Sequence, residues 1–229
     1  MKTAIVTGAS GNMGQSVVKK FLAEGYFVIG TLAPGNHVAV ESNGKNFETA
    51  VVDLMNEEAA QQFVQFASVK HDRIDVAVLT VGGFAMGKIA DTKTSDIEKQ
   101  YKLNFETAYN TARPIFVQML EQGSGRIFLI GSKPGSSMKN SKGMIGYGLA
   151  KSLIFRLAEL MNEEAKGTNV VTSVVVPSTI DTPQNRKSMP DAHYENWVKP
   201  ETIASVIHFY CTEEAAALRE PVIKIYNKS

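Results

Sequence analysis

Seven short runs of apolar and β-branched residues are spaced along the chain. Several of them, such as "TAIVT" and "VVTSVVV", are apolar or β-branched at nearly every position instead of at alternate positions. Strands covered on both faces show this pattern, whereas a strand with one face in water alternates apolar and polar residues. The sequence therefore predicts about seven buried strands, beginning near Thr3, Tyr26, Phe47, Ile74, Arg126, Val170 and Val222.

Longer segments with helical spacing lie between these runs. In "SVVKKFLAEG" the apolar residues Val17, Val18, Phe21 and Leu22 fall on one face of a helix. The segment "NEEAAQQFVQFASV" opens on Asn56, whose side chain suits a helix N-cap, and acidic residues follow in the first turn. Both segments are predicted to be amphipathic helices.

The alternation of strands and helices predicts an α/β fold. Consecutive parallel strands connect through right-handed crossovers, which place helices on both faces of a parallel sheet. A chain of 229 residues suits one such domain, so residues 1–229 are predicted to form a single domain. The stretch from Pro177 to Pro200 has no clear periodicity, and a substrate lid is predicted over about 178–198.

The charge balance argues against extended anionic partners. The chain has 24 Lys and Arg against 23 Asp and Glu, a formal net charge of +1, and no run of like charge stands out. Nucleic acids and anionic membranes select basic stripes or patches. Neither partner is expected, and the expected partner is a small-molecule substrate.

Cysteine and histidine usage bears on compartment and metal binding. Cys211 is the single cysteine, so no internal disulfide forms, and "MKTAIVTGAS" has too short an apolar run for a signal peptide. These features predict a cytoplasmic protein in which Cys211 is a buried small hydrophobe. The four histidines and Cys211 lack the spacing of a ligand cluster, so no metal site is predicted.

A glycine-rich turn follows the first strand directly. "TGASGNMGQSVV" places Gly8, Gly11 and Gly14 between a strand and a helix. Glycines in such a turn let the backbone approach a pyrophosphate, while the helix N-terminus offers free N–H groups and the last glycine allows close packing. A tight turn without a ligand is the alternative interpretation. The order of strand, turn and helix favours a Rossmann-type, doubly wound sheet that binds a dinucleotide.

The segment after the second strand bears on the choice between NAD and NADP. At this place an acid usually bonds the ribose hydroxyls, or a basic group accepts a 2′-phosphate. The stretch "TLAPGNHV" contains no acid, Arg or Lys, and its Asn36 and His37 suit either cofactor. The missing acid removes the usual barrier to the phosphate, so the sequence favours NADP over NAD by a small margin.

A second glycine-rich segment resembles a phosphate-binding loop but lacks one group. "GGFAMGKI" has the spacing of a P-loop as far as Lys88, but Ile89 stands where a Ser or Thr must bind magnesium. A P-loop is therefore excluded. The pair Gly82 and Gly83 is interpreted as a bend that lets a cofactor pass close to the backbone.

Tyr147 and Lys151 lie four residues apart in "YGLAK", on one face of a predicted helix. A surface aromatic–cation contact is one interpretation. The other is catalytic, because hydride transfer to a carbonyl or imine carbon leaves charge on the heteroatom, which a proton must neutralise. A phenol can donate that proton, and a nearby ammonium group is expected to lower the pKa of the phenol towards neutrality.

Four motifs occur in the order that is typical of one enzyme family. The loop "TGASGNMG", the strand end "IGS", the helix "YGLAK" and the turn "PSTIDT" resemble those of the short-chain dehydrogenases/reductases, over nearly the whole chain. The resemblance implies an NAD(P)(H)-dependent oxidoreductase with Tyr147 as general acid/base. It also implies that Lys151 holds the nicotinamide ribose, that Ser132 bonds the substrate oxygen, and that Asn104 organises a proton-relay water.

The same resemblance implies which residues bind the cofactor. Asp53, at the end of the third strand, is implied to face the adenine, with a helix-cap role as the alternative. Ile180 and Thr182 are implied to contact the carboxamide. The expected cofactor-binding set is Gly8, Ser10, Asn12, Met13, Gly14, Asp53, Leu54, Gly82, Lys151, Ile180 and Thr182.

Two positions depart from the family pattern. Asn12 stands where the family has its second loop glycine, and asparagine tolerates unusual backbone angles better than most residues. Ser132 lies farther before Tyr147 than the family spacing, which indicates a lengthened loop. Ser136 or Ser137 is therefore the alternative catalytic hydroxyl.

Within the family, "GMIGYGLAK" and "TIDTPQNRKSMPDA" most resemble dihydropteridine reductases, which return a quinonoid dihydropterin to its tetrahydro form. The missing acid and the presence of Ser132 depart from those enzymes and fit a general ketone or secondary-alcohol dehydrogenase. A non-catalytic nucleotide-binding sensor is a third hypothesis, although a sensor needs no proton donor. The residues expected to suit a flat, polar ligand are Asn185, Arg186, Lys187, Met189 and Trp197.

The helix that carries Tyr147 continues as "SLIFRLAELMNEE", with more apolar surface than one sheet face can cover. The family resemblance implies pairing through this helix and the one that contains Asn104. A homodimer or homotetramer is therefore expected, with intramolecular core as the alternative explanation of the apolar surface.

Overall fold

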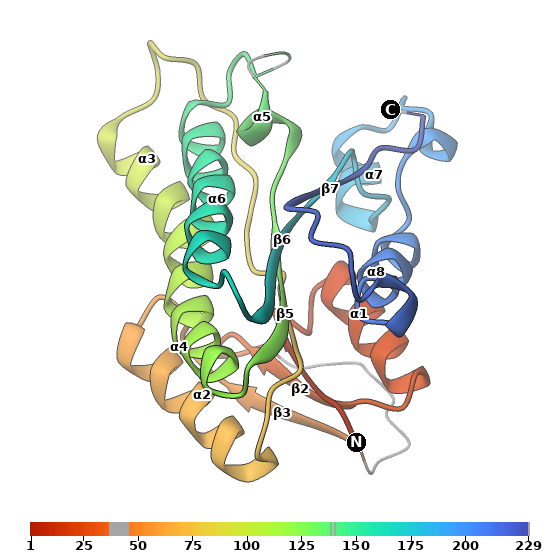
Figure 1. The fold of residues 1–229 in the computed structure, drawn as a ribbon. Coiled ribbons are helices and arrows are strands. Elements are labelled where there is room, and N and C mark those ends of the chain that lie inside the picture. The colour runs from red at the N-terminus through yellow and green to blue at the C-terminus, as the bar shows by residue number, and fades with distance from the viewer. Residues whose placement is uncertain (37–45, 138, 140, 229) are drawn as a thin grey trace.

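The computed structural model describes residues 1–36, 46–137, 139 and 141–228. Seven parallel strands form one sheet in the order β3-β2-β1-β4-β5-β6-β7, with helices on both faces (Figure 1). The predicted α/β fold with a doubly wound, Rossmann-type sheet is confirmed. The strands are β1 (Thr3–Thr7), β2 (Phe27–Leu32), β3 (Phe47–Val51), β4 (Val76–Leu79), β5 (Ser124–Ile130), β6 (Asn169–Pro177) and β7 (Val222–Ile225).

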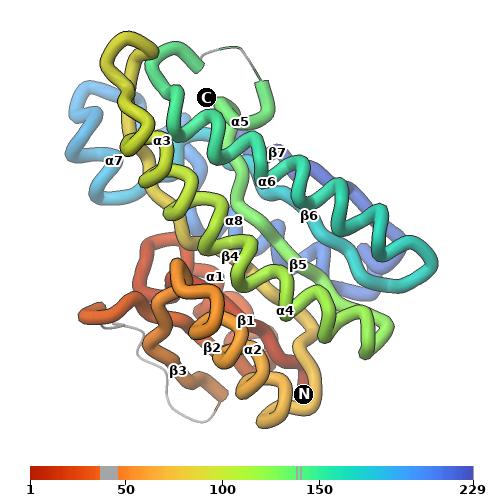
Figure 2. Tube along the Cα trace, turned by 90° about the vertical axis from the view of Figure 1, so that its left-hand side faces the viewer, coloured from red at the N-terminus to blue at the C-terminus, as the bar shows by residue number. Residues whose placement is uncertain are grey.

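Two layers of helices enclose the sheet. The helices α2, α4 and α6 lie next to one another on one face, and α1 and α8 cover the other (Figures 1 and 2). None of the described helices has both the length and the apolar character needed to cross a membrane. The helices are α1 (Asn12–Ala23), α2 (Glu57–His71), α3 (Thr94–Tyr101), the π-helical turn η1 (Lys102–Glu106), α4 (Thr107–Glu121), α5 (Lys133–Ser136), α6 (Ile145–Glu164), α7 (Pro183–Ser188), α8 (Pro200–Phe209) and the 3-10 turns η2 (Tyr194–Asn196) and η3 (Glu213–Ala215).

Each face of the sheet has its own apolar core. One core joins the strands to α2, α4 and α6 through residues such as Phe63, Ile115 and Ile154. The other joins them to α1 and α8 through residues such as Phe21 and Ile203. All residues of β1 and β4 are buried, which explains why these strands are apolar or β-branched throughout.

The strand order reverses between β1 and β4. The chain builds β1, β2 and β3 towards one edge and then returns to place β4 on the other side of β1. In open α/β sheets, ligands bind outside the carboxyl ends of the strands at such a point. Here Thr80 joins the two strand ends, since its N–H donates to Thr7 Oγ1 at 3.0 Å and its hydroxyl donates to the Thr7 carbonyl at 2.6 Å.

The turn between β1 and α1 is closely packed. Gly8 has a φ of +63°, which favours glycine. A Cβ atom on Gly14 would lie 2.2 Å from the Gly8 carbonyl oxygen, which real Cβ atoms do not approach so closely. The last glycine of the loop therefore brings the start of α1 against the end of β1, as the sequence predicted.

Gly14→Ala is expected to lower the free energy of unfolding by about 2 kcal/mol or more, because the methyl group must displace backbone atoms. Urea denaturation measures the change. Gly11→Ala is the matched control: Gly11 is exposed with a φ of −75°, and its Cβ would stand 3.3 Å from the same oxygen. Equal destabilisation by both substitutions would contradict the role given to Gly14.

Candidate active site

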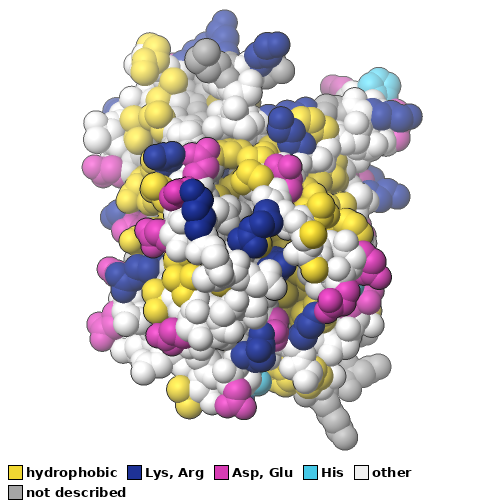
Figure 3. Space-filling model, in the orientation of Figure 1, with side chains coloured by type: hydrophobic (Ala, Val, Ile, Leu, Met, Phe, Trp, Pro, Cys, Tyr) yellow, Lys and Arg dark blue, Asp and Glu magenta, His cyan; other side chains and the backbone are white. Residues whose placement is uncertain are grey.

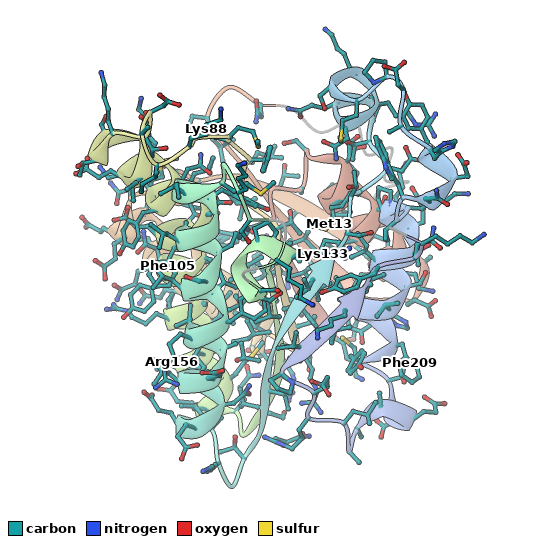
Figure 4. All side chains as sticks on the ribbon, turned by 90° about the horizontal axis from the view of Figure 1, so that it is seen from above. Met13, Lys88, Phe105, Lys133, Arg156 and Phe209 are labelled. Atoms are coloured by element: carbon teal, nitrogen blue, oxygen red, sulfur yellow. The ribbon has the colours of Figure 1, made fainter. Side chains whose placement is uncertain are left out.

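The predicted catalytic residues come from three elements at the carboxyl end of the sheet. Ser132 follows β5, Tyr147 and Lys151 lie on α6, and Asn104 lies in η1. Seen from above, Phe105 and Arg156 lie on one side of the sheet and Phe209 on the other, with Met13 and Lys133 between them (Figure 4). The site lies in this middle region, where β1 and β5 end.

The Ser132 hydroxyl lies beside the Tyr147 phenol, close enough to lower the pKa of the phenol. Ser132 is buried, and its hydroxyl oxygen also accepts the Gly135 N–H at 3.2 Å, which caps α5. The hydroxyl groups of Ser136 and Ser137 are used locally, by the Lys133 carbonyl and the Lys139 N–H. The lengthened loop thus leaves Ser132 beside Tyr147.

The pKa of Tyr147 lies above its ordinary value. Burial of the phenol disfavours the charged form and raises the pKa, and the Ser132 hydroxyl opposes this only in part. The net shift of the Tyr147 pKa is therefore opposite to the direction predicted from the spacing of Tyr147 and Lys151, because burial is the largest cause. The role of Lys151 in tuning the phenol stays a prediction.

Lys151 is a buried cation with a defined partner. Its side chain is 4% exposed, and Nζ donates to the Ile130 carbonyl at 2.8 Å. Burial lowers the pKa of Lys151 to about 8. A surface aromatic–cation contact is thereby excluded, since this ammonium group lies inside the molecule against the end of β5.

Asn104 joins the helix layer to the loop after β4. Its side-chain amide accepts the Gly83 N–H at 3.1 Å and donates to the Gly83 carbonyl at 2.9 Å. It lies in η1, and π-helical turns are frequent at functional sites. A Cβ on Gly82 would lie 2.8 Å from Asn104 Oδ1 and 3.2 Å from Lys151 Nζ, so these two side chains converge on one stretch of backbone.

The turn between β1 and α1 fits a dinucleotide. Side chains at Gly8 and Gly14 would strike backbone or neighbouring side chains, so the loop offers bare backbone and the N-terminus of α1. Asn12 is the first residue of α1 and has no positive φ, so the missing family glycine costs no strain. Ser10 lies in the turn and Met13 in the first turn of α1, and the Ser10 carbonyl accepts the Gln15 amide at 2.8 Å.

The residues expected near the adenosine lie at the ends of β2 and β3. Asp53 is exposed, and its carboxylate accepts the Met55 N–H at 3.0 Å. The cap of α2 is Asn56, whose side chain accepts the Ala59 N–H, so Asp53 is not the helix cap. Leu54 is buried and its carbonyl accepts the Asn110 amide. Asn36 is exposed, and His37 lies outside the described residues.

The two ends of the predicted lid are joined by backbone hydrogen bonds. Ile180 and Val198 form a parallel bridge, and the Asp181 N–H donates to the Val198 carbonyl at 2.8 Å. Between them, the Thr182 hydroxyl oxygen accepts the Asn185 N–H at 3.2 Å and caps α7. The Thr182 proton stays available for a ligand, because a hydroxyl donates and accepts at once.

Most polar groups that were expected to face a flat ligand bond within this loop. The Asn185 amide donates to the Ile180 carbonyl at 2.8 Å, and Arg186 makes two bonds to the Asp181 carboxylate, at 2.6 and 2.8 Å. Trp197 is 7% exposed. Lys187 and Met189 are exposed, and so is Arg186 in spite of its ion pair, so the ligand-facing role of this set stays a prediction.

Two contributors to the site, Thr80 and Phe84, were not predicted from the sequence, and Gly83 was predicted only as part of a bend near the cofactor. Thr80 bonds the end of β1, Gly83 bonds the Asn104 amide, and the ring of Phe84 packs edge-to-face against Tyr147, with centroids 5.1 Å apart. All three lie within five residues of each other, after β4. The glycine pair was the one available signal, since an adjacent aromatic residue has no characteristic pattern.

The described residues contain no group of three or more His, Cys, Asp and Glu side chains that could hold a metal. Burial raises the pKa of Cys211 to about 12. The thiol is therefore protonated at neutral pH, although Cys211 is half-buried and not fully buried as predicted.

Curated relatives that match this chain include several reductases. An acetoacetyl-CoA reductase of Acinetobacter sp. is 27% identical, with 98% of this chain and 96% of the relative covered. A dihydropteridine reductase of Dictyostelium discoideum is 25% identical over 100% of this chain and 96% of the relative. A 3-oxoacyl-[acyl-carrier-protein] reductase of Thermotoga maritima is 24% identical over 98% and 96%.

Solved structures show the same fold. A short-chain type dehydrogenase/reductase from Mycobacterium ulcerans has a TM-score of 0.89 at 20% identity, covering 99% of this chain and 89% of that one. The aldohexose dehydrogenase of Thermoplasma acidophilum has a TM-score of 0.84 at 21% identity, covering 98% and 92%. The family model described as short chain dehydrogenase matches residues 2–193. The chain therefore belongs to the short-chain dehydrogenase/reductase family.

Proposed function

We propose that this protein is an NAD(P)H-dependent oxidoreductase that reduces a C=O or C=N group of a small substrate. The observation that carries the proposal is the convergence of Lys151 and Asn104 on Gly82, with the Ser132 hydroxyl close enough to Tyr147 to lower its pKa. A proton donor, a second hydroxyl and a buried cation thus lie together beside a loop that fits a dinucleotide.

Tyr147 supplies the proton in this proposal. A nicotinamide cofactor, when bound, supplies the hydride. The raised pKa of Tyr147 keeps the phenol protonated at neutral pH, which is the form that reduction requires. Ser132 donates to the substrate oxygen, and Lys151 bonds the cofactor ribose through its ammonium group. Asn104, already bonded to Gly83, organises the relay water.

The cofactor is proposed to lie along the carboxyl ends of β1 and β4. The pyrophosphate would be held by Gly8, Ser10, Asn12, Met13 and Gly14. The remaining predicted contacts would hold the adenosine end and the nicotinamide end of the cofactor. The lack of an acid between Leu32 and Asn36 favours NADP over NAD. The contacts proposed for the two ends are Asp53, Leu54, Gly82, Ile180 and Thr182.

Two substrate classes are supported by different observations. Ser132 beside Tyr147 suits a carbonyl oxygen, which favours a ketone. The exposed ring of Phe84 beside Tyr147 suits a flat substrate such as a quinonoid dihydropterin. Residues 178–198 are proposed to close over either one, and the cytoplasm remains the location predicted from cysteine usage.

Tyr147→Phe is expected to lower kcat by about 10²- to 10⁴-fold, because the variant keeps the ring but lacks the proton donor. Ketones, aldehydes and a quinonoid dihydropterin are assayed with NADH and NADPH, and cofactor affinity is measured separately. Tyr210→Phe is the control. Full turnover by Tyr147→Phe would end the role given to this residue, and tight cofactor binding without turnover of any substrate by the wild type would favour a sensor.

The charge of Lys151 gives a pH-dependent stability. The folded pKa of about 8 lies below the ordinary 10.5, so the unfolded chain binds more protons between these values and stability rises with pH there. Lys151→Met removes this dependence. Between pH 7 and pH 10, the free energy of unfolding of the wild type is expected to rise by about 2 to 3 kcal/mol relative to that of Lys151→Met.

Chemical denaturation of both proteins across that pH range measures the difference. The exposed Lys19 supplies the control, Lys19→Met, for which the difference from wild type should not depend on pH. A pH-independent difference for Lys151→Met would show that the lysine is not a buried cation.

Association through the α4 and α6 faces is also proposed. Hydrophobic side chains are exposed among charged ones where α3, α4 and α6 lie (Figure 3). The exposed apolar residues of the two helices are Tyr109, Val117, Leu149, Leu153 and Leu160. Such a surface suits a homodimer or homotetramer built by pairing these helices.

The double substitution Leu153→Lys and Leu160→Lys is expected to convert the assembly to monomers, because it places charges in an apolar contact. Sedimentation equilibrium gives the subunit count. Leu218→Lys, at an exposed leucine outside α4 and α6, is the control. A monomeric wild type would contradict the proposed assembly.

A further inference from the structure

Phe84 presents an exposed aromatic ring beside the proposed proton donor. Its side chain is 59% exposed, and the ring packs against Tyr147 at 81° between the planes. This edge-to-face contact leaves much of the Phe84 ring in water. An exposed phenylalanine is common on protein surfaces, but this one touches the phenol that the proposed reaction uses.

The backbone on both sides of Phe84 is held in place. Before it, Gly83 exchanges two hydrogen bonds with the Asn104 amide. After it, the Gly87 N–H donates to the Gly143 carbonyl at 2.7 Å, and the Ile145 N–H donates to the Gly87 carbonyl at 3.2 Å. The loop is thus bonded to η1 before Phe84 and to the start of α6 after it.

The neighbouring side chains are apolar and adaptable. Met86 is 65% exposed, and its terminal methyl group lies 3.4 Å from where a Cβ of Gly143 would stand. Met144 directly precedes α6 and pairs with Gly87 through a backbone bridge. Methionine thioethers pack well against aromatic rings, so the exposed Met86, two residues after Phe84, suits an unsaturated ring better than a charged group.

We propose that Phe84 determines substrate specificity by stacking against a flat, conjugated ring that bears or adjoins the reduced group. This inference rests on the proposed function and narrows its substrate class. A flat ring on Phe84 lies beside the Tyr147 hydroxyl, whereas a saturated chain of equal size gains apolar contact without the additional stacking of two rings.

The test compares two ketones of equal carbon number, acetophenone and 2-octanone. Phe84→Ala is expected to lower kcat/KM about tenfold more for acetophenone than for 2-octanone. Phe84→Tyr should retain the preference for acetophenone, and Phe84→Leu should lose it. Phe66→Ala, which removes a ring of similar exposure on α2, should change neither rate.

Equal losses on both ketones, or recovery by leucine as complete as by tyrosine, would overturn the proposal, because either result indicates a structural role. Melting temperature and cofactor affinity show whether each variant is folded. If the wild type reduces neither ketone, calorimetry measures the binding of benzamide to the wild type and to each variant. Binding that is tenfold weaker in Phe84→Ala, and unchanged in Phe66→Ala, supports the proposal even without turnover of the ketones. Unchanged or absent benzamide binding overturns it.

Discussion

The buried ammonium group of Lys151 is the constraint on which the site depends. Its bond to the Ile130 carbonyl joins α6 to the last residue of β5, two positions before Ser132. With Lys151 held there, Tyr147, one turn earlier on the same helix, lies beside the serine hydroxyl. Holding a cation inside the protein costs about 3 kcal/mol, as its lowered pKa shows, and packing of α6 on the sheet must offset that cost.

The glycines around this cation share one role, which is to leave room for neighbouring side chains and backbone. Gly82 leaves room for Asn104 and Lys151, while Gly135 lets α5 lie against the backbone of α6 at Lys151. A side chain at either position would separate the elements that bring the site together. The same economy of space explains Gly14, where α1 approaches β1 closely enough to offer its N-terminus to a ligand.

The electrostatics of the site differ from a simple model of two neighbouring groups. Spacing alone places the phenol and the ammonium group on one helix face, which suggests that the cation lowers the phenol pKa. In the folded protein burial acts on both groups, raising the pKa of Tyr147 and lowering that of Lys151. Both shifts favour the neutral forms, which is the general consequence of withdrawing ionisable groups from water.

The sequence by itself determined the seven strands, their parallel arrangement and the order of motifs along the chain. These follow from local patterns, because a strand buried on both faces must be apolar wherever it occurs. The Asn56 cap and the glycine turn were equally local. Ser132 was among the predicted alternatives, but its distance from Tyr147 in space was set by the fold of the intervening loop.

Tertiary structure alone decided which polar groups stay available to a ligand. Asn185 and Arg186 look suited to recognition in the sequence, yet they bond the Ile180 carbonyl and the Asp181 carboxylate. Phe84 has no distinguishing pattern, yet its ring lies on Tyr147. Such contacts join residues of separate elements or turns, so they depend on how the chain folds in space. The direction of a pKa shift likewise depends on the burial that the fold creates.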